Sequence, residues 1–159
     1  MKKIIAIDVG NSETTVGVGN SDSWVGYRFT TRKTITSDEL LMMFKTIIDL
    51  KPLKENLIDG AIICSVVPQI TNSVALATSK FISKDAIVVG PGVKTGLKVN
   101  IDNPKELGPD RIANSIGGYI KTESSVIVVD LGTATTFDLV NDKKEYLGGS
   151  IAPGIKISL

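Results

Sequence analysis

Two aspartates near opposite ends of the sequence stand in the same local pattern. Asp8 lies in "IIAIDVGNSETTVGV" and Asp130 lies in "VIVVDLGTATTFDLV", 122 positions further on. In both, an apolar run is followed by Asp-x-Gly, by hydroxyl-bearing residues and by a second apolar run. Glycine permits a tight turn that brings backbone N–H groups close to a ligand. A carboxylate at a strand end can hold Mg²⁺ or another cation that bridges phosphates.

The two turns also offer hydroxyl groups to phosphate oxygens. The candidate donors are Ser12, Thr14, Thr133, Thr135 and Thr136. A single Asp-x-Gly after a strand is usually only a turn, in which the aspartate binds its own backbone. Two copies in the same context instead predict two hairpins that grip one nucleotide across a cleft. Neither copy has the glycine and lysine spacing of a Walker or Rossmann loop.

The composition limits the classes of partner and the groups that can transfer protons. The 159 residues are 42% hydrophobic and 22% charged, with a net charge of +1, which is typical of a soluble globular protein. Lys and Arg are scattered, so we expect no nucleic-acid and no membrane partner. The single cysteine, Cys64, lies in an apolar run and is predicted to be a buried thiol, which fits a reducing, cytoplasmic location. The sequence has no histidine, so proton transfer must use carboxylates, Lys, Tyr or the cysteine.

Hydrophobic patterns predict the order β-β-β-α-β-α-β for the first part of the chain. Strands are expected over 4–7, 14–18, 24–31, 60–67 and 86–90, and helices from Thr36 to Pro52 and over 69–83. Thr36 and Glu39 have the spacing of a capping box. The helices carry apolar stripes, Leu40, Met43, Phe44, Ile47 and Ile48 in the first and Ile70, Val74, Ala77 and Phe81 in the second.

A stretch rich in Gly and Pro then leads to one more helix. Pro109 suits its first turn, where the missing N–H does no harm, and Ile112, Ile116 and Ile120 form its apolar stripe. After this helix the strand, Asp-x-Gly turn and strand pattern restarts. The restart predicts a duplicated α/β domain.

The repeat sets the expected domain boundaries. Aligning Asp8 with Asp130 also aligns Thr14 with Thr136. We expect a first domain over residues 1–122 and, over residues 123–159, only the first strands of a second, truncated domain. The chain is therefore expected to be an N-terminal portion of a two-domain protein or one half of a split protein.

Several motifs together resemble a known family. "DVGNS" and "DLGTATT" resemble the two phosphate motifs of the superfamily of acetate and sugar kinases, heat-shock chaperones and actin. "PGVKTGL", "DNPKELGPDRIAN", "VVDLGTATTFD" and "GGSIAPGI" jointly resemble type III pantothenate kinase. The resemblance implies an actin-like (ribonuclease H-like) α/β fold with a duplicated domain. It also implies transfer of a phosphoryl group from ATP to pantothenate, giving 4'-phosphopantothenate in the first step of coenzyme A biosynthesis.

The resemblance assigns roles to individual residues. Asp110 matches the proton acceptor, and a carboxylate in the first turn of a helix is favoured by the positive helix end. The expected substrate-binding residues are Ile101, Gly108, Pro109, Asp110 and Arg111. The expected ATP-binding residues are Asp8, Val9, Gly10, Asn11, Ser12, Glu13, Thr14, Thr15 and Thr133. Asp130 matches the ligand of a monovalent cation, K⁺ or NH₄⁺, and Mg²⁺ is expected to accompany ATP.

Some features depart from the family pattern. Ile101 replaces a common aromatic residue of the substrate pocket, Ser12 replaces threonine, and Pro109 replaces alanine. The adenosine-binding loop and a threonine that closes the substrate site are missing from this sequence. We therefore expect weak ATP binding and negligible activity of the chain alone, with a homodimer or a missing C-terminal part needed for function. A non-catalytic accessory relative and another small-molecule kinase of the superfamily are the alternatives.

Overall fold

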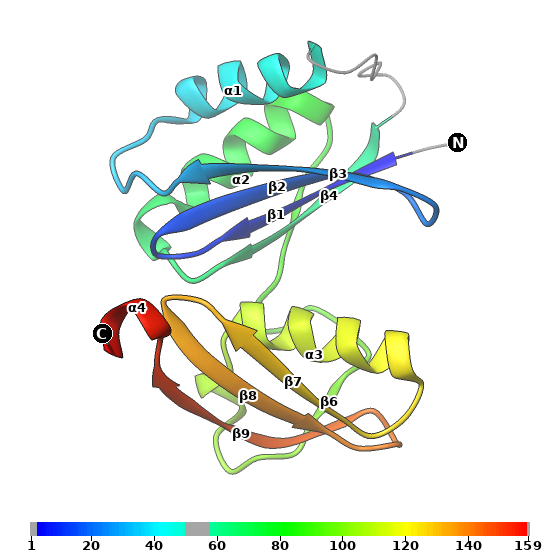
Figure 1. Ribbon diagram of the computed structural model, residues 1–159. Coiled ribbons are helices and arrows are strands. Elements are labelled where there is room, and N and C mark those ends of the chain that lie inside the picture. Colours follow the sequence, from blue (N-terminus) through cyan, green and yellow to red (C-terminus); the bar gives the residue numbers. More distant parts are fainter. Residues whose placement is uncertain (1–2, 50–57, 159) are drawn as a thin grey trace. The chain divides into compact units, whose positions relative to one another are not determined.

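The chain folds into two compact units, Met1–Val89 (unit 1) and Gly90–Leu159 (unit 2). The computed structural model describes residues 3–49 and 58–158 (Figure 1). Unit 2 includes residues 90–122, which the sequence repeat assigns to the first domain. Within the two described ranges, no helix is long and apolar enough to cross a membrane.

Unit 1 is a mixed sheet with two helices on one face (Figure 1). Its elements are β1 (Lys3–Val9), β2 (Glu13–Gly19), β3 (Trp24–Thr30), α1 (Ser37–Asp49), β4 (Ile58–Ser65), α2 (Pro68–Ile82) and β5 (Ile87–Val88). The predicted order β-β-β-α-β-α-β is confirmed. The strands lie in the order β3-β2-β1-β4-β5, with β1, β2 and β3 antiparallel and β4 parallel to both β1 and β5.

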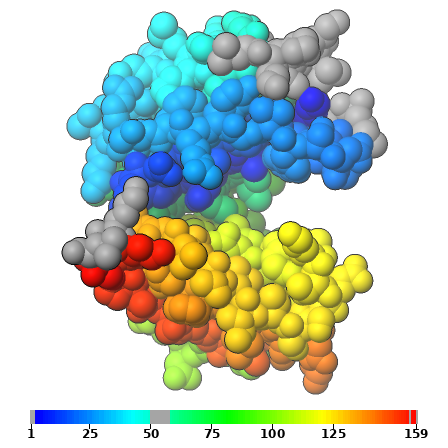
Figure 2. Space-filling model, in the orientation of Figure 1, coloured from blue at the N-terminus to red at the C-terminus, as the bar shows by residue number. Residues whose placement is uncertain are grey.

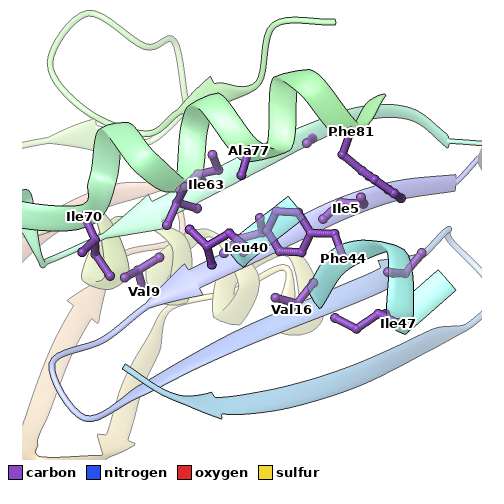
Figure 3. Close-up of a cluster of buried hydrophobic side chains, with 14 of the residues drawn as sticks. Ile5, Val9, Val16, Leu40, Phe44, Ile47, Ile63, Ile70, Ala77 and Phe81 are labelled. Carbon is purple, nitrogen blue, oxygen red and sulfur yellow. The ribbon is translucent and has the colours of Figure 1, made fainter. Parts of the chain in front are cut away.

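The core of unit 1 lies between this sheet and its two helices (Figure 3). Successive strand residues point to opposite faces, so Ile5, Ile7 and Val9 of β1 all face the helices and are at most 2% exposed. The predicted apolar stripes of both helices are buried or packed against this core. The rings of Phe44 in α1 and Phe81 in α2 meet edge-on, with 6.1 Å between centroids.

The predicted capping box begins α1. The Thr36 backbone N–H donates to Glu39 Oε2 at 2.9 Å, and the Glu39 N–H donates to Thr36 Oγ1 at 3.2 Å. The first of these bonds, together with a bond that the Thr36 hydroxyl donates to Glu39 Oε2 at 2.9 Å, lowers the pKa of the Glu39 carboxyl. Pro52, which is predicted to end this helix, lies outside the described residues. Cys64 is buried in β4, as expected.

Unit 2 is a mixed sheet, antiparallel except for one parallel strand pair, with a helix on one face. Its elements are β6 (Lys98–Val99), a 3-10 helix η2 (Pro104–Glu106), α3 (Pro109–Thr122), β7 (Val126–Leu131), β8 (Ala134–Val140), β9 (Glu145–Pro153) and α4 (Ile155–Ser158). The strands lie in the order β6-β9-β8-β7. β7, β8 and β9 repeat the antiparallel order of β1, β2 and β3, so the predicted duplication is present in the fold.

Two details of unit 2 differ from the sequence-based expectation. β6 and η2 fall in the stretch expected to be irregular, because two-residue pairings leave no periodic signal. Helix α3 begins at Pro109 as predicted, but its stripe is incomplete. Ile112 and Ile116 pack against the second core, whereas Ile120 is 62% exposed.

The two Asp-x-Gly hairpins differ by one residue at the turn. Val9 pairs with Thr14 across four intervening residues, whereas Leu131 pairs with Thr135 across three. Thr135 therefore occupies the position of Thr14, and these two side chains are 7% and 8% exposed. The predicted alignment of Thr14 with Thr136 was wrong, because a constant offset does not follow the shorter second turn.

When the equivalent strands of the two units are compared, the helices of unit 1 and helix α3 of unit 2 cover opposite faces of the repeated strands. Helix α3 packs against the face of β7 that holds Val126 and Val128. The opposite face carries five apolar side chains that are 39–66% exposed, namely Ile127, Val129, Leu131, Phe137 and Leu139. We call these five residues the bare face. Their counterparts in unit 1 form the buried core, so the repeat is present in the strands but not in the covering helices.

Candidate active site

The first hairpin of the repeat is closed by its own backbone. The Gly10 N–H donates to the Glu13 carbonyl at 3.0 Å, and a Cβ at Gly10 would already lie 3.0 Å from that oxygen. The turn therefore favours glycine at this position. Asn11, Ser12 and Glu13 are exposed at the tip of the hairpin.

Thr31, directly after β3, fixes this hairpin from the side. Its hydroxyl donates to the Gly10 carbonyl at 2.7 Å, and its backbone N–H donates to the Ser12 carbonyl at 2.9 Å. Thr14 Oγ1 lies 2.9 Å from Thr31 Oγ1. A hydroxyl has one proton to donate, and that of Thr31 points to Gly10, so Thr14 is the donor in this pair.

In this arrangement, the predicted ATP-binding residues of the first hairpin differ in their exposure to solvent. The proton of the Thr14 hydroxyl is used by Thr31, and the Val9 side chain is fully buried. The Asp8 side chain at the end of β1 is exposed, and Thr15 is half-buried. Sequence reasoning missed Thr31 because it lies outside the hairpin, at the end of the third strand.

The second hairpin is supported by a glycine from the "GGSIAPGI" motif. The Gly132 N–H donates to the Ala134 carbonyl at 3.0 Å, and the Gly154 N–H donates to the Thr133 carbonyl at 3.2 Å. A Cβ at Gly154 would overlap the carbonyl oxygens of Gly132 and Thr133. The turn that follows Asp130 thus packs so closely against Gly154 that no side chain would fit at that position.

Asp130 is held by the helix that precedes its strand. The Asn114 side-chain amide in α3 donates to Asp130 Oδ2 at 2.9 Å. Within residues 3–49 and 58–158, the Asp130 Oδ1 atom accepts no hydrogen bond, and no three His, Cys, Asp or Glu side chains gather as a metal site. Asp130 therefore offers one oriented carboxylate oxygen, which suits a weakly bound cation better than a fully protein-ligated divalent metal.

Asp110 lies in the first turn of α3, as predicted. Gly108 precedes the helix in an extended conformation, and Pro109 occupies the first helical position. Asp110 Oδ1 accepts a hydrogen bond from the Arg111 backbone N–H at 2.8 Å. The carboxylate is half-buried beside the positive end of the helix. Ile101, also expected to bind substrate, is half-buried and packs against the core of unit 2.

Arg111 reaches from α3 to a buried carboxylate on β8. Its Nε and Nη2 atoms lie 2.8 Å and 2.7 Å from Asp138 Oδ1. Nη2 also donates to the Tyr146 hydroxyl at 2.9 Å, and that hydroxyl donates to Asp138 Oδ1 at 2.8 Å. We call Arg111, Asp138 and Tyr146 the arginine cluster. The elements that carry it lie side by side in unit 2, with α3 in yellow and β8 in gold to orange (Figure 2).

The arginine cluster is almost completely shielded from solvent. Asp138 is fully buried, Tyr146 is 1% exposed, and the Arg111 side chain is 13% exposed. Burial and the hydrogen bond to Asp138 raise the pKa of Tyr146 to about 12. Burial alone would lower the pKa of Arg111, but the hydrogen bond and charge of Asp138 raise it. Arg111 thus stays protonated and Tyr146 stays neutral near neutral pH.

A second glycine of the same motif makes room for this cluster. Gly149 lies opposite Asp138 in the ladder between β8 and β9. A Cβ at Gly149 would overlap the Phe137 carbonyl oxygen and Arg111 Nη2. Asp138 and Tyr146 were not predicted, because nothing in a strand pattern distinguishes a polar residue that faces a helix from one that faces solvent.

Solved structures with low sequence identity share this fold. The type II variant of the Aquifex aeolicus Ppx/GppA phosphatase matches with a TM-score of 0.54 and 15% identity, over 99% of this chain and 54% of its own. A Sinorhizobium meliloti protein described as a 2-dehydro-3-deoxygalactonokinase matches with a TM-score of 0.50 and 14% identity, over 93% and 52%. Together with the repeated hairpins, these matches define an actin-like α/β fold, as predicted.

Sequence comparison then identifies the family. The family model of type III pantothenate kinase matches residues 4–159. Type III pantothenate kinases of Pelobacter propionicus and Geotalea daltonii are 44% and 43% identical to the chain over 157 residues, 98% of its length. The chain belongs to the type III pantothenate kinase family. It spans 62% and 61% of the length of these two relatives.

Proposed function

We propose that the chain is part of an enzyme that transfers a phosphoryl group from ATP to the primary hydroxyl of pantothenate. The product is 4'-phosphopantothenate, and the reaction is the first step of coenzyme A biosynthesis in the cytoplasm. The observation that carries this proposal is the position of Asp110 in the first turn of α3, next to Arg111, in a chain that matches the family over residues 4–159. This position offers a base and a substrate-binding cation on adjacent residues.

Asp110 is the proposed general base. Its Oδ1 atom is held by the Arg111 backbone N–H, which leaves Oδ2 to accept the proton of the attacking hydroxyl. The hydroxyl oxygen then forms a bond to the γ-phosphorus as the bond from that phosphorus to the bridging oxygen breaks, and ADP leaves. A positioned base of this kind typically contributes about 10²–10⁴-fold to the rate.

Pantothenate is proposed to contact the start of α3 and the segment before it. Arg111 supplies hydrogen-bond donors, and Gly108 and Pro109 shape the turn that presents Asp110. Ile101 is half-buried and packs against the core of unit 2. An aliphatic residue here gives the substrate an apolar wall without a ring to stack on.

ATP is proposed to bind through the hairpin Asp8–Thr15 and through Thr133. The closed turn at Gly10 and the exposed residues Asn11 and Ser12 are the parts of the first hairpin suited to phosphate contacts. Thr14 serves instead to hold the turn, through Thr31. The second hairpin contributes Thr133, whose carbonyl is fixed by the Gly154 N–H.

Two cations are proposed to accompany the nucleotide. Asp8, exposed at the end of β1, suits a hydrated Mg²⁺ that is held mainly by phosphate oxygens. Asp130, with one carboxylate oxygen turned away from Asn114, suits a monovalent cation, K⁺ or NH₄⁺. Bound cations would neutralise charge on the transferred phosphoryl group.

The active enzyme is proposed to contain more polypeptide than this chain. The relatives extend well beyond the matched length, and the bare face of unit 2 exposes Val129 and Phe137 next to each other. Burial of such side chains typically stabilises a protein by about 1.5–3 kcal/mol each. A homodimer or an additional segment that covers this face would supply that burial.

The proposal is tested with a hybrid protein, in which this chain is joined to the part of the Pelobacter propionicus relative that it does not match. The hybrid protein and the chain alone are incubated with ATP and pantothenate, and the products are identified by mass spectrometry. We expect 4'-phosphopantothenate from the hybrid protein and almost none from the chain alone. Phosphorylation of a sugar acid or acetate in place of pantothenate would identify another kinase, and binding of both substrates without turnover would identify an accessory protein.

A further inference from the structure

In addition to Arg111, the proposed substrate-binding residue, the arginine cluster contains two buried residues, Asp138 and Tyr146. Arg111 has five N–H donors in a planar fork, and two of its nitrogens are turned to Asp138 and Tyr146. The third, Nη1, makes no hydrogen bond to any residue that the structure describes. Since the side chain is still 13% exposed, this nitrogen is the one left for a ligand.

The geometry points to Asp138 and Tyr146 as positioning residues for Arg111. We propose that they fix the guanidinium in one orientation, so that Nη1 faces the substrate while Nε and Nη2 are used within the protein. The inference rests on the proposed role of Arg111 in binding pantothenate. Neither Asp138 nor Tyr146 is expected to touch the substrate itself, because both are fully or almost fully buried.

Three observations support a fixed orientation. Asp138 Oδ1 receives Nε, Nη2 and the Tyr146 hydroxyl together, at 2.8, 2.7 and 2.8 Å, so a rotation of the guanidinium would break several bonds at once. Tyr146 also lies under the guanidinium, with its ring centroid 6.0 Å from Arg111 Cζ. Thr136 Oγ1 lies 3.4 Å from Asp138 Oδ2 and restrains the carboxylate on its other side.

The charge balance has a consequence for recognition. Asp138 neutralises Arg111, so the pair offers a directed hydrogen bond rather than an unpaired positive charge. Such a donor gains its value from orientation, since a long arginine side chain otherwise has to lose rotamer freedom when the ligand binds. Removing Asp138 would leave the positive charge in place but let the fork turn.

The test uses nuclear magnetic resonance on the chain and pantothenate titrations on both the chain and the hybrid protein. In the unaltered chain we expect the Arg111 Nε–H signal to be protected from solvent exchange. In Asp138→Asn this protection should be lost and pantothenate affinity should fall about tenfold, the loss expected for one hydrogen bond to a charged group. ATP affinity should not change. Asp142→Asn, at an exposed position in the turn before β9, is the matched control and should alter neither readout.

A double-mutant cycle separates positioning from a general structural role. Arg111→Lys and Asp138→Asn should each weaken pantothenate binding, and their combination should weaken it no further, because Asp138 acts through Arg111. Losses that multiply would overturn the proposal, as would an unchanged Arg111 signal in Asp138→Asn. If Asp138→Asn does not fold, Tyr146→Phe keeps the ring and removes only the two hydrogen bonds of the hydroxyl, with Arg111 Nη2 and Asp138 Oδ1, and the same change in the Arg111 signal is expected. Because that signal needs no ligand, it tests the positioning even if pantothenate is not the substrate.

Discussion

Gly149 faces Asp138 across the ladder between β8 and β9. Because Gly149 has no side chain, the Arg111 guanidinium has room to lie there and to bind Asp138. A methyl group there would overlap Arg111 Nη2 and the Phe137 carbonyl oxygen. Overpacking of this kind typically costs about 1–3 kcal/mol. A motif glycine on one strand is thus explained by a side chain that comes from a helix.

We expect Gly149→Ala to lower the free energy of unfolding by about 1–3 kcal/mol in urea denaturation. The matched control is Gly117→Ala in α3, where an added Cβ meets no atom within 4 Å. Alanine is the better helix former, so this control should gain up to about 1 kcal/mol. Equal denaturation midpoints for the two variants would contradict the steric account.

Tyr146→Phe should change how stability depends on pH. The folded protein raises the pKa of Tyr146 from 10.0 to about 12, so it holds the phenol proton more tightly than the unfolded chain does. The stability that this provides is fully present below pH 10 and is lost as the pH rises from 10 to about 12. The difference in unfolding free energy between wild type and Tyr146→Phe should therefore shrink over that range, by an amount on the order of 2 kcal/mol. Tyr119→Phe is the control, and a constant difference for Tyr146→Phe would contradict the assignment.

Thr31→Val should loosen the first hairpin. Valine keeps the shape of threonine but cannot bind the Gly10 carbonyl or the Thr14 hydroxyl, and a buried group left without a partner costs about 1–3 kcal/mol. We expect a lower free energy of unfolding, measured by denaturant titration of the hybrid protein. We also expect weaker ATP binding and unchanged pantothenate binding, both measured by ligand titration of the same protein. Thr30→Val changes the exposed neighbouring position in β3 and should leave ATP binding as it is. Equal ATP affinities for both variants would show that the hairpin does not depend on Thr31.

The bare face predicts association of the isolated chain. Val129 and Phe137 are direct partners in the ladder between β7 and β8 and are 49% and 39% exposed. We expect the mass measured by analytical ultracentrifugation to rise above that of a monomer with concentration. Replacing both residues by lysine should return the chain to a monomer, whereas Ile87→Lys on unit 1, also at an exposed apolar position, should not. A wild-type chain that stays monomeric at every concentration would contradict this prediction.

The repeated strands and the helix starts could be predicted because they depend on local signals. The capping box of Thr36 and Glu39 and the Pro109 helix start are written within a few neighbouring residues. The alternation of buried residues in β1 likewise follows from the period of a strand. These features need no knowledge of distant contacts.

The rest of the site depends on tertiary contacts that a pattern does not contain. Asp138 lies 27 positions from Arg111, and Thr31 lies 21 positions from Gly10. Each was missed because its importance comes only from the partner that the fold brings to it. The shorter second turn, which places Thr135 rather than Thr136 at the position of Thr14, was missed because a constant sequence offset does not register a change in turn length.

The most direct test of the proposed function is the turnover of Asp110→Asn in the hybrid protein. Asparagine keeps the size of the side chain and an oxygen for the Arg111 N–H, but it cannot accept the proton of the hydroxyl. We predict that pantothenate still binds with an affinity close to that of wild type, while kcat falls by about 10²–10⁴-fold. A variant that phosphorylates pantothenate within a factor of about two of the wild-type rate, well short of that loss, would show that Asp110 is not the base.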